Sequence, residues 1–270
     1  MVPLLSIKTT TALPPSRFER PGLASFVAYL ASAIVIVWSL SGTGWSFSEL
    51  ARGLPAIGDF LSRAWPPDVA RLPTLLRALV ETFQMALIGT LVGALFSLPL
   101  GILAARGLVG GKLTYVASRG LIALFRTVPD LIWALLFVIS VGLGPFAGTL
   151  ALTVDTIGFC GRFFAEAMEE VDQGPREALT ATGARSLDVV ACAVVPAAMP
   201  SFLTATLFAL EKATRSSVIL GLVGAGGIGL ELKVAMDLFE YPLALTIIAM
   251  IFVLVLGVER VGAMLRARMI

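Results

Sequence analysis

The stretch TFQMALIGTLVGALFSLPLGILAA, from Thr82 to Ala105, contains no charged residue and is apolar over most of its length. A helix needs about 20 mostly apolar residues to cross the hydrocarbon core of a bilayer, so this stretch can span a membrane. The whole chain has a matching composition: 57% of its 270 residues are hydrophobic and 14% are charged. Soluble domains carry about 25% charged residues. We therefore predict a protein that crosses the membrane several times.

Five other stretches have a similar length and apolar character. One of them, residues 146–167, also contains the charged residues Asp155 and Arg162. The sequence predicts an all-α polytopic membrane protein with about six transmembrane helices. The five additional predicted spans are residues 25–40, 127–143, 146–167, 194–213 and 241–262.

Lys and Arg residues give the predicted orientation, because they are enriched in cytoplasmic loops. Their distribution places both termini in the cytoplasm. The predicted organisation is a cytoplasmic tail, a first transmembrane helix, an outer amphipathic loop, and a multi-span core with one long inner and one long outer loop. These segments are residues 1–23, 24–41, 42–80 and 81–265, with the inner loop at 168–196 and the outer glycine-rich loop at 214–240.

The outer glycine-rich loop contains SVILGLVGAGGIG, in which Gly224, Gly226 and Gly229 have the spacing G-x-G-x-x-G. A dinucleotide site would need a strand before these glycines and an acidic residue about 20 positions later, and Glu231 and Asp237 come too early. Glycine permits left-handed turns and close backbone approach. We predict that these residues and Gly227 form a tightly packed re-entrant or gate-forming loop at the outer mouth. A flexible loop without substrate contact and a dinucleotide-dependent membrane oxidoreductase are the alternatives.

The inner loop contains EALTATGARSLDVVACAVVP, from Glu177 to Pro196. Gln173-Gly174-Pro175 can begin a helix that Gly183 ends, and Ser186 can cap a second one. The positions of Glu177, Ala178, Gly183 and Pro196 resemble the EAA loop of binding-protein-dependent ABC importer permeases. Leu179, Ala193 and Val195 depart from that pattern. The resemblance implies that this coupling loop docks into a cleft of a separate ATPase subunit.

Two further segments resemble phosphonate-type ABC permeases: RTVPDLIWALLFV with the following GLGPFAG, and VILGLVGAGGIG. The resemblance covers about residues 80–265. It implies a type I ABC importer permease fold and the import of phosphonate or a related phosphorus oxyanion across the bacterial inner membrane. It also implies a homodimer that works with two ATP-binding subunits and an extracytoplasmic substrate-binding protein. An importer of another small solute such as methionine is the alternative within this class.

The chain carries no sign of catalytic chemistry. It lacks the phosphate-binding pattern G-x-x-x-x-G-K-[ST], so ATP and Mg²⁺ are expected in the partner ATPase and no cofactor in this chain. It contains no His, and we interpret Cys160 and Cys192 as small buried side chains rather than metal ligands. The net charge of +2 gives no reason to expect nucleic acid as a partner.

Charged residues within the predicted spans need an explanation, because a charge at the bilayer centre costs about 3 kcal/mol even on the gentlest scale. Arg126 and Asp130 are four residues apart, as are Glu211 and Arg215, so each pair can form an ion pair on one helix face. These pairs either line a polar translocation path or only hold helices together. A proton-coupled carrier that uses Asp130 or Asp155 is a further alternative.

Overall fold

The computed structural model describes residues 22–268, and within them every regular element is helical. Most of the predicted N-terminal tail lies outside the described residues. The chain divides into two compact units, Met1–Gly58 and Asp59–Ile270. Helix α1 (Leu23–Gly42) belongs to the first unit, and α2 (Phe47–Ala64) extends from the first into the second.

Helices α1 and α2 differ in the arrangement of their apolar residues. Helix α1 is apolar around its whole circumference and has no buried side chain among the described residues, as expected for a helix surrounded by lipid. Helix α2 is amphipathic: Leu50, Leu54 and Leu61 follow a helical repeat, while Glu49 and Arg63 are charged residues at its ends. This pattern fits the amphipathic character predicted for the outer loop.

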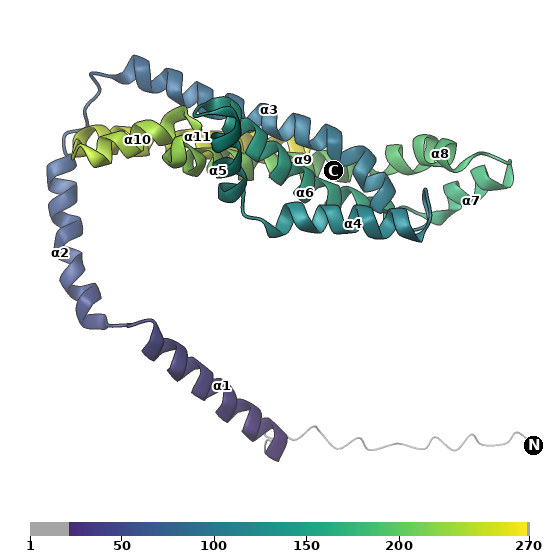
Figure 1. The fold of residues 1–270 in the computed structure, drawn as a ribbon, viewed down its shortest axis with the longest axis horizontal. Coiled ribbons are helices and arrows are strands. Elements are labelled where there is room, and N and C mark those ends of the chain that lie inside the picture. Colours follow the sequence, from purple (N-terminus) through teal and green to yellow (C-terminus); the bar gives the residue numbers. More distant parts are fainter. Residues whose placement is uncertain (1–21, 269–270) are drawn as a thin grey trace, which may run out of the picture. The chain divides into compact units, whose positions relative to one another are not determined.

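The second unit contains the remaining helices (Figure 1). The elements are α3 (Leu72–Ala104), α4 (Lys112–Thr127), α5 (Asp130–Val141), α6 (Pro145–Glu169), α7 (Gln173–Ala181), α8 (Ser186–Val189), the π-helical turn η1 (Val190–Val194), α9 (Val195–Leu220), the π-helical turn η2 (Gly221–Ala225), α10 (Gly227–Asp237) and α11 (Tyr241–Ala267). Helices α3, α6 and α9 pack against one another in the middle of this unit, whereas α7 and α8 lie at one end and α10 lies at the other.

Small residues bring α3 and α6 into close contact. A Cβ atom at Gly89 would lie 2.7 Å from the Cβ of Leu152, so only glycine permits this approach. The Ser97 hydroxyl donates to the carbonyl of Gly93 at 2.7 Å and also lies 3.3 Å from the carbonyl of Ile157 on α6. Helices in lipid associate through such small residues and interhelical hydrogen bonds. The sequence GTLVGALFS within the opening stretch therefore forms a helix-packing face.

Within residues 22–268, four helical runs are long and apolar enough to cross a membrane: α1, α3, the run Ser186–Ala225, and α11. A bent pair, α4 and α5, makes five if it counts as one span. The predicted third span, residues 127–143, is not one helix, because the chain bends by 88° between α4 and α5. Pro129 explains the break, since proline lacks an N–H group and moves the preceding residue to extended geometry. The protein is an all-α, multi-pass membrane protein, as predicted.

Helix α6 corresponds to the remaining predicted span. Its 25 residues cover about 37 Å, which is enough to cross the hydrocarbon core. However, α6 is not among the helices that are apolar enough to count as membrane spans, and it contains Asp155 and Arg162. It is instead well packed by protein: Cys160, Ala165 and Met168 are buried. Cys192 is exposed, so the prediction of two buried cysteines is wrong for that residue.

Candidate functional site

The first helix of the coupling loop, α7, is bounded by local hydrogen bonds. The carboxylate of Asp172 accepts from the N–H of Gly174 at 3.2 Å and caps the start of the helix. At the other end, Gly183 has a φ of +83°, its N–H donates to Thr180, and the N–H of Ala184 donates to Leu179. This is a Schellman motif, which requires a left-handed residue. The predicted helix end at Gly183 is therefore confirmed.

The second helix of the loop differs from its prediction in two respects. Its N-cap is Arg185 rather than Ser186, and the N–H of Arg185 donates to the carboxylate of Asp188 at 3.3 Å. It is also not a separate short helix, because α8 continues through η1 into α9 as one helical run from Ser186 to Leu220. Pro196 accounts for η1: its ring would collide with the carbonyl four residues earlier, and a π-helical turn relieves this clash.

This continuous helix has a mechanical consequence. At 1.5 Å per residue, the run from Ser186 to Leu220 extends about 50 Å, well beyond the roughly 30 Å thickness of the hydrocarbon core. Part of the helix must therefore project beyond the membrane. Displacement of α8 acts directly on α9, since no flexible linker separates them.

The residues of the predicted coupling motif are accessible. Glu177, Ala178 and Gly183 are exposed on and after α7, and Pro196 is exposed in the first turn of α9. A Cβ atom at Gly183 would meet nothing within 4 Å. Helix α7, which carries Glu177 and Ala178, lies at one end of the unit (Figure 1).

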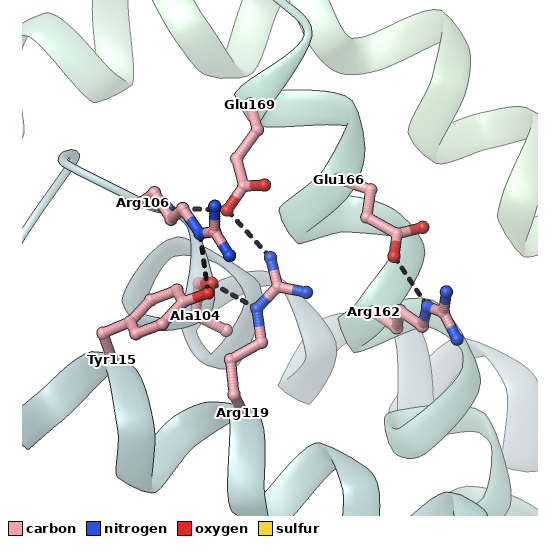
Figure 2. A network of polar contacts seen from close by, with 7 residues as sticks. All are labelled: Ala104, Arg106, Tyr115, Arg119, Arg162, Glu166 and Glu169. Carbon is pink, nitrogen blue, oxygen red and sulfur yellow. Dashed lines mark hydrogen bonds and ion pairs between the residues drawn. The ribbon is translucent and has the colours of Figure 1, made fainter.

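A polar network fixes the base of the coupling loop (Figure 2). One carboxylate oxygen of Glu169, at the end of α6, accepts from the backbone N–H of Arg106 and from the guanidinium of Arg119, each at 2.8 Å. The guanidinium of Arg106 donates to the hydroxyl of Tyr115 at 2.9 Å, and this interaction raises the pKa of Arg106. Arg176 of α7 donates to the carbonyl of Gly107 at 3.1 Å. The loop is thereby connected to the turn between α3 and α4.

The sequence-based prediction missed this network. Its members come from the turn between α3 and α4 and from helices α4, α6 and α7, and no regular spacing relates them. The only available signal was the presence of charged residues at the ends of neighbouring helices.

The glycine segment, residues 221–229, is tightly packed against other parts of the unit. Gly224, Gly226 and Gly227 have φ values of +94°, +82° and +70°. The N–H of Gly227 donates to the carboxylate of Glu81, and the N–H of Ile228 donates to the hydroxyl of Thr82, each at 2.8 Å. Helix α10 is therefore capped by residues of α3, and the sequence-based prediction missed Glu81 and Thr82.

The same segment also contacts the turn between α5 and α6. The N–H of Gly144 donates to the carbonyl of Gly224 at 3.0 Å, and a Cβ atom at Gly226 would lie 3.1 Å from Pro145. Gly229 is buried against the backbone of Val218. Beside the segment is a cavity of about 370 Å³ whose polar lining includes Glu81 and Glu231. The chain before the glycines is helical, so the strand that a dinucleotide fingerprint requires is absent from this part of the structure.

The two predicted ion pairs within single helices are wrong. Glu211 accepts from Arg266 of α11 at 2.7 Å, and Arg215 pairs with Glu259, also of α11. Spacing along one helix allows a pair, but here a facing helix supplies a partner for each side chain. Arg126 and Asp130 are not paired either, because the 88° bend separates them.

Three ion pairs therefore connect helices at one level of the unit. Besides the two pairs between α9 and α11, Lys212 of α9 donates to both oxygens of Asp155 on α6, at 2.7 and 2.8 Å. The pair between Glu211 and Arg266 is well buried, with exposed side-chain fractions of 9% and 17%. These contacts of Glu211, Arg215 and Asp155 join α6, α9 and α11. Asp130 instead accepts from the N–H of the following residue, Leu131.

A bundle of long apolar helices with an exposed helical loop fits the membrane subunit of a transport system. Residues 97–270 match the family "Binding-protein-dependent transport system inner membrane component", and the chain belongs to this family.

Known relatives agree with this assignment. The chain is 38% identical, over 86% of its length and 84% of the relative, to the putative phosphite transport system permease protein HtxC of Stutzerimonas stutzeri. It is 37% identical to the phosphate-import permease protein PhnE of Mycolicibacterium smegmatis, over 80% of its length and 41% of that protein.

A solved structure supports the fold. A chain of the MetNI methionine ABC transporter in an inward-facing conformation superposes with a TM-score of 0.67 and 24% identity, over 75% of this chain and 99% of that one. The predicted type I ABC importer permease fold is confirmed. The protein is an ABC importer permease, a pore component and not an enzyme.

Proposed function

We propose that this permease translocates phosphonate or a related phosphorus oxyanion across the bacterial inner membrane. The observation that carries the proposal is the 38% identity to the putative phosphite permease over most of both chains. The probable D-methionine transport system permease protein MetI of Vibrio cholerae is 28% identical over 70% of this chain, which supports a methionine substrate less strongly.

The proposed assembly contains a second permease copy, two ATP-binding subunits and an extracytoplasmic substrate-binding protein. The description of the family as binding-protein-dependent supports the last of these. ATP and Mg²⁺ are bound by the ATP-binding subunits, and both termini of the permease are cytoplasmic. The exposed coupling loop, residues 168–196, supplies the docking surface, with Glu177, Ala178 and Gly183 accessible to a partner.

The proposed mechanism is alternating access driven by the ATPases. Their closure displaces α7 and α8, and the continuous helix carries this movement through α9 towards the glycine segment. Gly224 and Gly226 lie where this helix ends and can change backbone conformation more readily than other residues. The glycine segment then opens or closes the outer mouth through its contacts with α3 and the α5–α6 turn.

Uptake by the reconstituted complex tests the proposal. Proteoliposomes containing the permease, its ATPase and its binding protein are supplied with ATP and labelled phosphite, methylphosphonate, phosphate or methionine. We expect uptake of at least one phosphorus oxyanion, dependence on ATP, and insensitivity to a protonophore. Import of methionine alone would contradict the substrate class, and protonophore-sensitive import without ATP would contradict the mechanism.

A further inference from the structure

A basic pocket of about 220 Å³ lies between α4 and α6, apart from the coupling loop and the glycine segment. Arg119 and Arg126 line it from α4, and Arg162 and Glu166 line it from α6. Three arginines and one glutamate thus line the same pocket. The rest of its lining is the apolar pair Ile122 and Ala123.

The hydrogen bonds of the three arginines leave most of their donors free. Arg119 donates to Glu169 and to the carbonyl of Ala104, and Arg162 donates to Glu166 at 2.6 Å (Figure 2). A guanidinium carries five N–H donors. The side chain of Arg126 forms no hydrogen bond or ion pair with any other residue between 22 and 268. Since Glu166 and Glu169 each neutralise another arginine, the charge of Arg126 remains uncompensated.

Close contact between the two helices positions Arg126 at the pocket. A Cβ atom at Gly158 of α6 would lie 3.0 Å from the Cγ of Arg126 and 3.1 Å from its backbone nitrogen. The glycine therefore lets the last turn of α4 lie directly on α6. The stem of Arg126 is held against α6, while the residue as a whole remains exposed to an incoming group.

We propose that this pocket binds a phosphorus oxyanion. Guanidinium groups bind phosphate oxygens through paired N–H donors, and the several oxygens of a tetrahedral oxyanion can engage two or three arginines together. A transported phosphonate, phosphite or phosphate fits this chemistry, and so does the headgroup of an anionic phospholipid. The first source rests on the proposed function; the second does not.

Equilibrium binding to the assembled permease–ATPase complex tests the inference. In nanodiscs of phosphatidylcholine alone, inorganic phosphate is titrated and its binding is followed by ³¹P line broadening. We expect Arg126→Gln to weaken phosphate binding about tenfold, as the loss of a charge-assisted contact does. Arg126→Lys should restore part of the affinity. Arg77→Gln removes an exposed arginine at the far end of α3 and should leave binding unchanged.

Binding of phosphatidylglycerol distinguishes a transported oxyanion from a lipid headgroup as the ligand of the pocket. If phosphate does not bind the wild type, retention of phosphatidylglycerol during purification should depend on Arg126 and not on Arg77. Arg162→Gln serves as a second variant at the same pocket and should act in the same direction. If neither phosphate nor phosphatidylglycerol binding responds to Arg126 or Arg162, the inference is wrong. Uptake by the wild type is measured separately, so failure of the proposed substrate is distinguishable from failure of the pocket.

Discussion

The coupling loop and the glycine segment lie at opposite ends of the same unit and are built in opposite ways (Figure 1). The coupling loop is exposed, and its helix caps come from residues within a few positions of one another. The glycine segment is packed within the protein, and its cap comes from Glu81 and Thr82, 146 positions away in the chain. The coupling loop is accessible to a partner protein, whereas the glycine segment packs against other parts of its own chain. Glycines in the two regions should therefore respond differently to substitution.

The largest difference is expected for matched valine variants. Gly227→Val introduces a β-branched residue at positive φ and a collision with the hydroxyl of Thr82. Strain and overpacking together should lower the free energy of unfolding by about 4 kcal/mol. Gly183→Val has the same backbone strain but no nearby atom, so it should cost about 1–2 kcal/mol. Denaturant unfolding of the purified permease in micelles measures both, and equal losses would contradict the contrast.

The buried ion pair between α9 and α11 is also a long-range contact and should be sensitive to loss of one partner. Glu211→Gln or Arg266→Gln leaves an uncompensated charge, with an expected cost of about 3 kcal/mol. The double variant should recover much of this loss. Arg215→Gln should not rescue Glu211→Gln, because Arg215 pairs with Glu259. If Arg215→Gln rescued Glu211→Gln and Arg266→Gln did not, the result would support the pairing of Glu211 with Arg215 that helical spacing predicts.

Loss of the distant cap should loosen the glycine segment. Glu81→Ala leaves the N–H of Gly227 without its acceptor, which should cost about 2 kcal/mol. Amide hydrogen exchange should become faster in residues 226–230, and uptake should fall while the ATPase remains bound. Glu231→Ala removes another carboxylate from the same cavity and serves as the control. Unchanged exchange in Glu81→Ala would show that this cap does not hold the segment.

The smallest effect is expected for the local cap of α7. Asp172→Ala removes the acceptor for the N–H of Gly174 and should destabilise α7 by about 1 kcal/mol. Since α7 is exposed, overall stability should change little, but substrate-stimulated ATP hydrolysis should decrease. Asp172→Asn retains a capping oxygen and should behave almost as the wild type. Equal loss of hydrolysis in both variants would argue against the cap.

The two ends also differ in how far their structure could be predicted from the sequence. The end of α7 at Gly183 depends on a local rule, so the sequence predicted it correctly. The partners of Glu211 and Arg215 depend on how α9 faces α11, and helical spacing alone selected the wrong residues. Pro129 was visible in the sequence, but the apolar run around it hid the 88° bend between α4 and α5. Glu81 escaped notice for the same reason as Glu211: its partner is distant in the chain.

The most direct test of the account is ATP-driven uptake by the complex that carries Gly183→Asp. Gly183 is exposed and meets no other atom, so a charged side chain there should leave the protein inserted in the membrane while obstructing docking. Proteoliposomes with wild-type permease, ATPase and binding protein are compared with the variant, with membrane insertion quantified in both. We predict phosphite uptake coupled to ATP hydrolysis in the wild type and loss of both coupling and uptake in the variant. Wild-type coupling and uptake in Gly183→Asp would contradict the role of this loop.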